Sequence, residues 1–361
     1  MQEKNQNQEI NENEELSEVE LQEQMQVRVD KLHDLVAKGN DPFEEITFDV
    51  THHSTDITEH FEELENATVS VAGRLLSRRG MGKVSFCDLH DRLGRIQIFT
   101  KIDAIGEEAY ADWQKLDIGD IVGVTGEVFR TRTGEISIRT SSYTLLAKAL
   151  RPLPNKFHGL KDTELRYRQR YVDLIINPEV RSTFEKRSKV ISEIRHFMDD
   201  LSFIEVETPI LNTIPGGASA RPFVTHHNTL DIDMYMRIAP ELYLKRLIVG
   251  GFERVYEIGR LFRNEGMDVK HNPEFTTIEC YQAFTDLRGM MKLTEDLIAN
   301  CCRKVLGTTE ITYQGTAINL TPPFARMTMT EAVAKYSGVD FSKITTDEEA
   351  FAAAKEKGIE P

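Results

Sequence analysis

The sequence has few cysteines and no long apolar run, and both shortages limit its class. The 361 residues include four cysteines, without the spacing of a metal site, and that number fits a reducing compartment better than a disulfide scaffold. No uninterrupted apolar run approaches the roughly 20 residues that cross a bilayer. The acidic, polar start MQEKNQNQEINENEE is not a secretory signal. We therefore expect a cytoplasmic protein with no membrane segment.

A strand–GxGxxG–helix unit is also missing, which argues against a Rossmann nucleotide site. The net charge of −15 is unusual for a protein that binds nucleic acid, but it is unevenly placed. Residues 1–65 hold 19 Asp or Glu against 4 Lys or Arg, so the remaining residues are balanced. The acidity therefore leaves room for a local basic surface.

The chain is long enough for two or three domains, and its composition changes along it. Residues 1–65 predict an acidic, partly disordered extension with a helix over 16–38. Residues 66–150 contain five short β-rich runs and one helical stretch at 107–115, which predict an OB-type five-stranded barrel. The five runs are 67–76, 83–88, 95–100, 121–130 and 135–145.

Residues 151–361 mix helices and strands, so the expected fold class is α+β. After a Pro-punctuated linker at 151–159, Asn177 and Pro178 predict the start of a long helix. The strand FIEVETP follows it and ends at Pro209. We expect an antiparallel sheet with flanking helices in this part of the chain.

The stretch 254–284, RVYEIGRLFRNEGMDVKHNPEFTTIECYQAF, predicts a hairpin. Apolar residues fill most positions of 255–262 without helical spacing, and 278–284 is similarly rich in them. The loop 264–273 is charged and contains a Gly and a Pro. Arg263 supplies a planar fork for phosphate or carboxylate oxygens, and Phe275 offers a ring on which a purine can stack. On spacing alone, a surface hairpin with solvated charges is an equal alternative.

FRNE, HNPEFT and ECY in this hairpin resemble motif 2 of the class II aminoacyl-tRNA synthetases. PGGASARPFVTHHN (215–228) and RIAPELYLKRLIVGG (237–251) resemble the lysyl-tRNA synthetases in particular, and the similarity runs from about residue 20 to the end. The resemblance implies a lysine–tRNA ligase that joins lysine to ATP and then to the 3′ end of tRNA(Lys), with Mg²⁺ accompanying ATP. It also implies that the helix from Pro178 and the strand ending at Pro209, as motif 1, build a homodimer interface.

The resemblance also implies roles for residues of the hairpin and of the segments before it. Arg263 is the catalytic residue, bridging the α-phosphate and the lysine carboxylate. The ATP site comprises Arg263, Glu265, His271, Asn272 and Phe275. The lysine site comprises Gly217, Ala218, Glu241, Glu279 and Tyr281.

Physical chemistry supports the lysine assignment, because an ammonium taken from water must be paired. A Glu inside an apolar strand run such as TTIECYQAF is unusual, and Tyr281 lies on the same face as Glu279. Taken singly, an exposed or ion-paired Glu is the more common outcome. Gly217 suits a loop that approaches the substrate.

The barrel is expected to bind the tRNA anticodon, since related synthetases use this domain to do so. The expected face comprises Arg79, Phe86, Gln97 and Glu135. Phe86 is the stacking candidate, although a place in the barrel core is an open alternative, and Gln97 and Arg79 are candidates for reading base edges.

No metal site is expected in the chain, because the His pairs at 52–53 and 226–227 lack partners at ligand spacing. The third motif of the family, with a second ATP-binding Arg, and the acidic residues that hold magnesium do not appear after Phe284. We therefore expect a catalytic domain that is incomplete at its carboxyl end. Three alternatives stay open: an aspartyl- or asparaginyl-type class II synthetase, a lysyl-adenylate enzyme that acts on something other than tRNA, and a non-catalytic tRNA-binding fragment.

Overall fold

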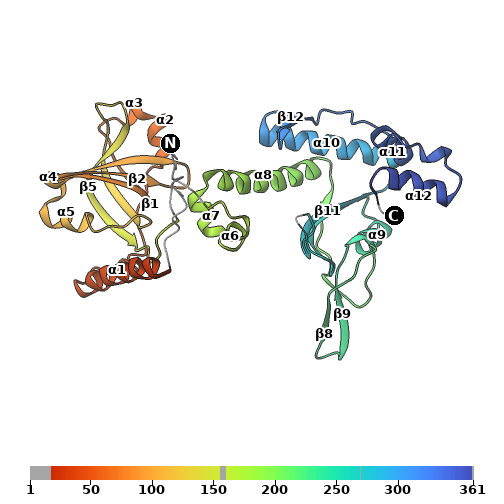
Figure 1. Cartoon of the computed structure of the whole chain (residues 1–361), viewed down its shortest axis with the longest axis horizontal. Helices are drawn as coiled ribbons and strands as arrows, with labels where there is room; N and C mark the ends of the chain where they lie inside the picture. The colour runs from red at the N-terminus through yellow and green to blue at the C-terminus, as the bar shows by residue number, and fades with distance from the viewer. Residues whose placement is uncertain (1–17, 155–159, 269, 360–361) are drawn as a thin grey trace, which may run out of the picture. The chain divides into compact units, whose positions relative to one another are not determined.

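The computed structural model describes residues 18–154, 160–268 and 270–359, and these form two compact units, 1–180 and 181–361. The expected disorder of residues 1–15 lies outside the described residues. Figure 1 shows the elements of both units. Each unit is considered by itself below.

The first unit is built around a closed five-stranded barrel with the strand order β1-β2-β3-β5-β4. Neighbouring strands are antiparallel except β3 and β5, which pair in parallel. The strands are β1 (Thr68–Met81), β2 (Val84–His90), β3 (Arg95–Lys101), β4 (Ile121–Arg130) and β5 (Ile136–Ala147). The OB-type barrel is therefore confirmed, and β4 has the expected bounds, while β1 runs five residues further than expected because it pairs with β2 up to Met81.

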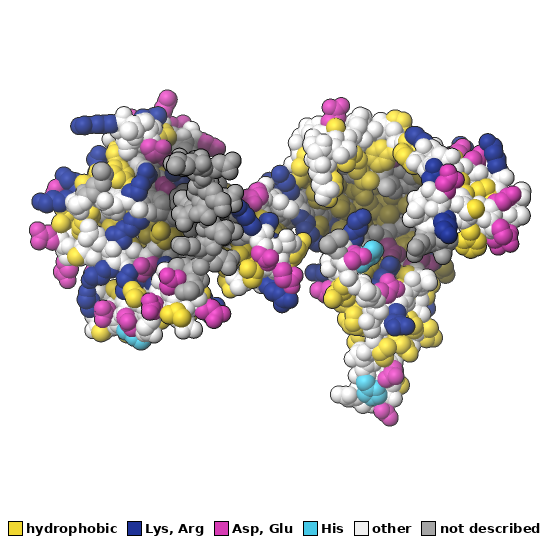
Figure 2. Space-filling view, viewed as in Figure 1, with side chains coloured by type: hydrophobic (Ala, Val, Ile, Leu, Met, Phe, Trp, Pro, Cys, Tyr) yellow, Lys and Arg dark blue, Asp and Glu magenta, His cyan; other side chains and the backbone are white. Residues whose placement is uncertain are grey.

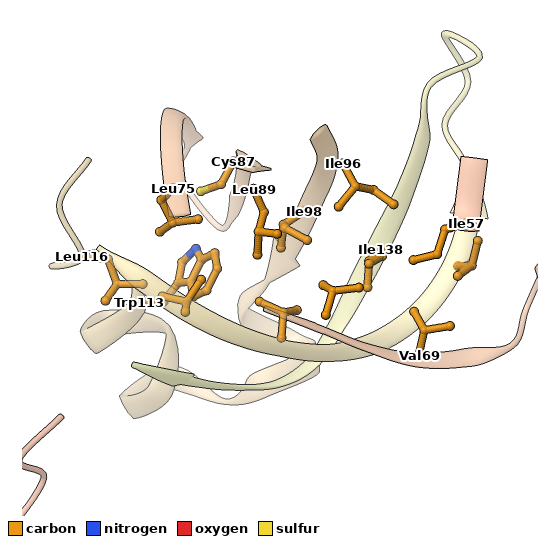
Figure 3. Close-up of a cluster of buried hydrophobic side chains, with 14 of the residues drawn as sticks. Ile57, Val69, Leu75, Cys87, Leu89, Ile96, Ile98, Trp113, Leu116 and Ile138 are labelled. Atoms are coloured by element: carbon orange, nitrogen blue, oxygen red, sulfur yellow. The ribbon is translucent and has the colours of Figure 1, made fainter. Parts of the chain in front are cut away.

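Alternate side chains along the strands point inward and fill the interior of the barrel. Leu89, Ile96, Ile98 and Ile138 are fully buried together with Trp113, which packs edge-on against Tyr143 and donates from its indole nitrogen to Ser85 Oγ at 3.3 Å. Figure 3 shows how the four aliphatic side chains and Trp113 converge on the interior. Residues at odd positions of β3, such as Phe99, consequently point to the outer face of the barrel.

Helices precede the barrel strands in the sequence, lie between β3 and β4, and follow β5. They are α1 (Glu18–Ala37), α2 (Ser54–Glu59), α3 (Phe61–Leu64), α4 (Ile102–Ile105), α5 (Glu107–Trp113), α6 (Thr163–Arg168), α7 (Arg170–Ile176) and α8 (Pro178–Asp200), the last of which continues into the second unit. α8 begins at the expected Pro178. α1 is joined to the barrel by Lys31, which pairs with Asp117 at 2.7 Å, and Asp117 also accepts from the buried Lys148.

The second unit contains a three-stranded sheet with the order β11-β10-β6. β10 (Arg254–Phe262) and β11 (Glu274–Gln282) are antiparallel, and β6 (Ile204–Glu205) pairs with β10 in parallel. The expected strand FIEVETP therefore contributes only two paired residues and runs parallel, not antiparallel. β11 begins four residues earlier than expected and ends before Phe284, which adopts φ 57° and is 93% exposed.

The hydrophobic core of this unit lies between one face of the hairpin and the helices α8 and α10 (Leu287–Leu306). Tyr256 of β10 packs with Met198, Phe203 and Leu293, and Ile278 and Cys280 of β11 pack against this cluster. α10 is capped by Asp286, whose side chain accepts from the Gly289 amide, and it ends at Gly307 in the left-handed conformation.

Smaller elements complete the unit. β7 (Leu211–Asn212), β9 (Ile232–Met236) and β8 (Val224–His227) form a second sheet in that order, followed by α9 (Glu241–Val249). After α10 come β12 (Glu310–Tyr313), β13 (Thr316–Asn319), α11 (Met329–Ser337), a 3₁₀ turn (Phe341–Lys343) and α12 (Asp347–Glu356). The α+β class is therefore confirmed, with helices flanking the sheet (Figure 1).

Candidate functional site

The two faces of the β10–β11 hairpin differ in chemistry. Residues with side chains on one face pair as Tyr256 with Cys280 and Ile258 with Ile278, and these pack into the core. On the other face Glu257 pairs with Glu279, and Leu261 pairs with Phe275. The carboxylates therefore lie on the face that turns away from the core.

Arg263 directly follows β10 at the end of this second face. Its amide donates to the Pro273 carbonyl at 2.8 Å, and its guanidinium carbon lies 5.2 Å from the centre of the Phe275 ring. Among the described residues, its buried Nε atom has no hydrogen-bond partner. A buried donor without an acceptor is costly, so this atom is suited to an oxygen of a bound ligand.

The loop after Arg263 is organised by local hydrogen bonds. Asp268 accepts from the amides of Lys270 and His271 at 2.7 and 2.8 Å and from His271 Nδ1 at 2.8 Å. The His271 hydrogen bond is the main reason that the pKa of Asp268 is lowered. Glu265 accepts from the Arg221 amide at 3.3 Å. The expected ATP residues Glu265, His271 and Asn272 are thus exposed on one loop.

Glu279 and Tyr281 lie on the same face of β11, as expected. The Tyr281 hydroxyl donates to Glu279 Oε2 at 3.2 Å. Burial raises the pKa of Glu279, and the nearby charges of Glu241 and Glu257 raise it further. A cation brought to this position would be paired with a partly desolvated carboxylate.

Glu241 lies in the first turn of α9 and pairs with Lys245 one turn later. Gly217 adopts φ +87°, and a Cβ there would lie 3.1 Å from the Cβ atoms of both Ala239 and Glu241. Gly217 therefore adjoins Glu241, and a side chain would be strained and crowded at that position. Ala218, its neighbour, is exposed.

Two charged residues in this region were not anticipated from the sequence. Arg237 and Glu257 are each 4% exposed and form an ion pair, and Thr208 Oγ1 donates to Glu257 Oε2 at 2.6 Å. The available signal was the Glu inside the apolar run VYEIGRLF, which is as unusual as the Glu inside TTIECYQAF.

The four residues expected to bind RNA lie along the outer face of the barrel. Arg79 is exposed and pairs in register with Phe86, which is half-buried and packs against Phe99 with ring centres 5.0 Å apart. Phe86 is absent from the barrel core, so that alternative is wrong. Phe99 in turn contacts Phe129 at 5.6 Å. A row of aromatic rings thus crosses the outer surface.

The other two residues of this face already have partners. Gln97 is buried, and its Oε1 accepts from Ser137 Oγ at 2.9 Å. Glu135 accepts from Arg95 at 2.8 Å, and Arg95 also pairs with Asp88 at 3.1 Å. RNA contacts with Gln97 or Glu135 would therefore be made within an existing polar network.

Other surfaces of the second unit are apolar or open. Figure 2 shows hydrophobic side chains gathered in a hollow below α10. A cleft of about 540 Å³ beside α10 and α11 is lined by Met291, Glu295, Phe324 and Arg326 among others, and none of the expected site residues contributes to it.

Within residues 18–154, 160–268 and 270–359, no three His, Cys, Asp or Glu side chains are grouped as metal ligands. None of the helices among the described residues is long and apolar enough to cross a bilayer.

In comparisons with known proteins, two segments of the chain match protein-family models. Residues 162–357 match "tRNA synthetases class II (D, K and N)", and residues 69–146 match "OB-fold nucleic acid binding domain". The second match coincides with the barrel strands, and the first includes the hairpin.

Curated relatives are similar over nearly the whole chain. A lysine–tRNA ligase of Clostridium botulinum strain Hall is 58% identical over 338 residues, which are 94% of this chain and 67% of the relative. A lysine–tRNA ligase of Clostridium perfringens strain SM101 is 57% identical over 341 residues, or 94% and 68% of the two chains. The chain thus spans about two thirds of the length of these relatives.

Proposed function

This chain belongs to the lysine–tRNA ligase family of class II aminoacyl-tRNA synthetases, and we propose that it activates lysine with ATP and transfers it to the 3′ end of tRNA(Lys). The observation that carries the proposal for the site is the face of the hairpin that bears Arg263, Phe275 and Glu279. It combines a donor directly after β10, which is buried and has no partner in the described part of the chain, with an aromatic ring and a half-buried carboxylate on β11.

In the first step the lysine carboxylate attacks the α-phosphorus of ATP in line, which forms lysyl-adenylate as the bond to the leaving pyrophosphate breaks. Negative charge accumulates on the phosphate oxygens, so positioning and charge neutralisation suffice and no enzyme nucleophile is needed. Arg263 would donate to the α-phosphate and the lysine carboxylate, and its Nε atom is free to do so. Phe275, 5.2 Å from the guanidinium carbon, would stack on adenine.

The remaining ATP contacts would come from the loop 264–273. Glu265 would accept from the adenine amino group, and His271 and Asn272 would reach the other phosphates. Asp268 holds the backbone near His271 by two amide hydrogen bonds. This arrangement keeps His271 on a defined turn at the exposed end of the hairpin. Magnesium accompanies ATP in this family.

Lysine would be recognised by Glu279 and Glu241, with Tyr281 held against Glu279 and with Gly217 and Ala218 near the α-amino end. A neutral or acidic amino acid would leave the half-buried Glu279 carboxylate without an ammonium partner. Unmade polar contacts of this kind can give discrimination of about 10⁴ or more. Lys245 now pairs with Glu241 and is 56% exposed, so a bound ammonium could replace it.

The barrel would bind the anticodon through Arg79, Phe86, Gln97 and Glu135. Phe86 lies on the outer surface with Phe99, which provides a stacking platform for an unpaired base.

We further propose a cytoplasmic homodimer that uses α8 and β6. Three large apolar side chains of this region, Phe184, Ile204 and Ile210, are between 43% and 46% exposed. Burial of these side chains by a second copy would remove apolar surface from water. Analytical ultracentrifugation would test this: a dimer of the chain that dissociates in a Phe184→Glu variant is expected, and a monomer of the unaltered chain would contradict it.

ATP–pyrophosphate exchange with lysine, aspartate, asparagine and ornithine tests the proposed reaction. We expect exchange with lysine alone. Exchange with aspartate or asparagine would contradict the lysine assignment. Absence of exchange with all four would contradict activation by this chain, and filter binding of tRNA(Lys) would then measure the function of the barrel separately.

A further inference from the structure

A buried ion pair adjoins the proposed lysine site, and its function is not explained by the reaction itself. Arg237 precedes α9, and Glu257 lies on β10 directly opposite Glu279. Both side chains of the pair are 4% exposed. Burying two charges is expensive even when they are paired, so the position calls for an explanation beyond stability.

Arg237 is fixed by more contacts than the ion pair alone. Its Nε donates to the Arg260 carbonyl at 2.9 Å, and Nη1 donates to the carbonyl and hydroxyl of Thr208 at 3.2 Å each. Its own carbonyl accepts from the Phe262 amide at 3.0 Å. The guanidinium is therefore held against β10 on the face that carries Glu257.

The sequence leaves room for this guanidinium at Gly259. A Cβ at that position would overlap Arg237 Nη2 and would lie 3.3 Å from Glu257 Oε1. Gly259 stands two residues after Glu257, on the same face of the strand. The guanidinium consequently occupies the space of a missing side chain within the row that leads to Arg263.

Glu279 is surrounded by charged and titratable groups from every neighbouring element. Tyr281 hydrogen bonds to it from β11, Glu241 faces it from α9, Glu257 faces it from β10, and the Arg237 charge acts from the segment before α9. Arg237 is thus the one cation among these four neighbours, and its charge favours the ionised form of Glu279.

We propose that Glu257 is a positioning residue of the lysine site, which engages the Arg237 guanidinium and thereby leaves Glu279 available to the ε-ammonium of the substrate. This inference rests on the proposed function. Without Glu257, the planar donors of Arg237 would lose their carboxylate partner on the face of the hairpin that carries Glu279. Arg237 would then compete with lysine for the Glu279 carboxylate. Without Arg237, the charge of Glu257 would face Glu279 uncompensated.

The two losses have different pH signatures. Lysine binds to ionised Glu279, whose pKa is already raised by burial, so affinity falls as the pH drops through that pKa. Arg237→Gln removes the cation, raises the pKa further and moves this loss of affinity to higher pH. Glu257→Gln removes the like charge and moves it to lower pH, while competition from Arg237 weakens binding on the plateau.

The test is the dissociation constant of lysine, measured by isothermal titration calorimetry between about pH 5 and pH 7, where lysine keeps its charges. We expect opposite displacements of the acid midpoint by about one pH unit for the two variants. For Glu257→Gln we also expect a plateau affinity about tenfold weaker. Glu274→Gln is the matched control, because this exposed Glu lies on the opposite face of the same hairpin.

Displacement of both midpoints in the same direction, or an unchanged plateau for Glu257→Gln, would overturn the proposal. Failure of the proposed function looks different: the unaltered chain would bind no lysine, or would bind norleucine equally well although norleucine lacks the ε-ammonium.

Each single variant removes one partner of the buried ion pair, so folding is checked by circular dichroism. If neither folds, the charge-balanced double variant Arg237→Gln/Glu257→Gln decides. We expect it to bind lysine within about threefold of the unaltered chain at the same acid midpoint. A folded double variant that has lost lysine binding would overturn the proposal.

Discussion

Replacement of Phe86 by Ala should weaken tRNA binding without affecting amino-acid activation. The ring is half-buried on the outer face of the barrel, packs 5.0 Å from Phe99, and is not part of the barrel core. Stacking of one base on an aromatic ring contributes about 1–3 kcal/mol. The dissociation constant for tRNA(Lys) should therefore rise about 5- to 150-fold.

The structural cost of the same replacement should be small. Loss of the contact with Phe99 amounts to about 0.5–1.5 kcal/mol, whereas Leu89→Ala, at a fully buried position of the neighbouring core, should cost about 2–5 kcal/mol. Leu89→Ala is therefore the control for barrel damage. Urea denaturation measures both stabilities, and filter binding with ATP–pyrophosphate exchange measures function.

Two results would refute the reasoning for Phe86. If Phe86→Ala destabilised the barrel as much as Leu89→Ala, the ring would be acting as core. If tRNA affinity were unchanged in a stable variant, no base would stack on this ring.

Three further changes test the catalytic half. Glu279→Gln should raise the lysine KM about 10- to 150-fold, because a charged hydrogen bond worth about 1.5–3 kcal/mol is lost. Exchange kinetics should show an unchanged ATP KM, with Glu274→Gln as the control. Equal effects on the KM values of both substrates would contradict the assignment. Arg263→Lys should lower kcat/KM for exchange about 10²- to 10³-fold, since one of the donors aimed at the developing charge is lost. Near-normal exchange would mean that Arg263 does not contact the α-phosphate. Gly259→Ala should lower the free energy of unfolding, measured by urea denaturation, by about 1–3 kcal/mol, because the new Cβ would overlap Arg237. Unchanged stability would show that the guanidinium can move to another position.

Local patterns predicted the barrel and the hairpin well. Turns separate the β-rich runs, and alternate residues of each strand fill the interior of the barrel. Composition and the two-residue period were therefore sufficient to predict β4, whose observed ends both match the prediction. The hairpin loop was equally clear from its charge and its Pro273. β11 was placed too late because Glu274 and Thr276 obscure its apolar pattern, although both pair with β10.

Long-range pairings could not be predicted in the same way. β6 is defined only by its two parallel pairs with β10, some 50 residues away, and nothing in FIEVETP specifies that neighbour. The partner of Glu257 lies 20 residues earlier and outside any regular element. An intrastrand Glu signals that a buried carboxylate needs a partner, but it does not identify Arg237 as that partner.

The division of the β10–β11 hairpin into two faces also bears on how errors in folding would be recognised. A slip of one residue in register would exchange the faces, so Glu257 would enter the core beside Met198 while Tyr256 and Ile258 would turn outward. Charged groups in the core would prevent α8 and α10 from packing on the sheet. A chain with a misaligned site would therefore remain open to proteases. This error would not let a well-folded enzyme that attaches the wrong amino acid accumulate in the cell.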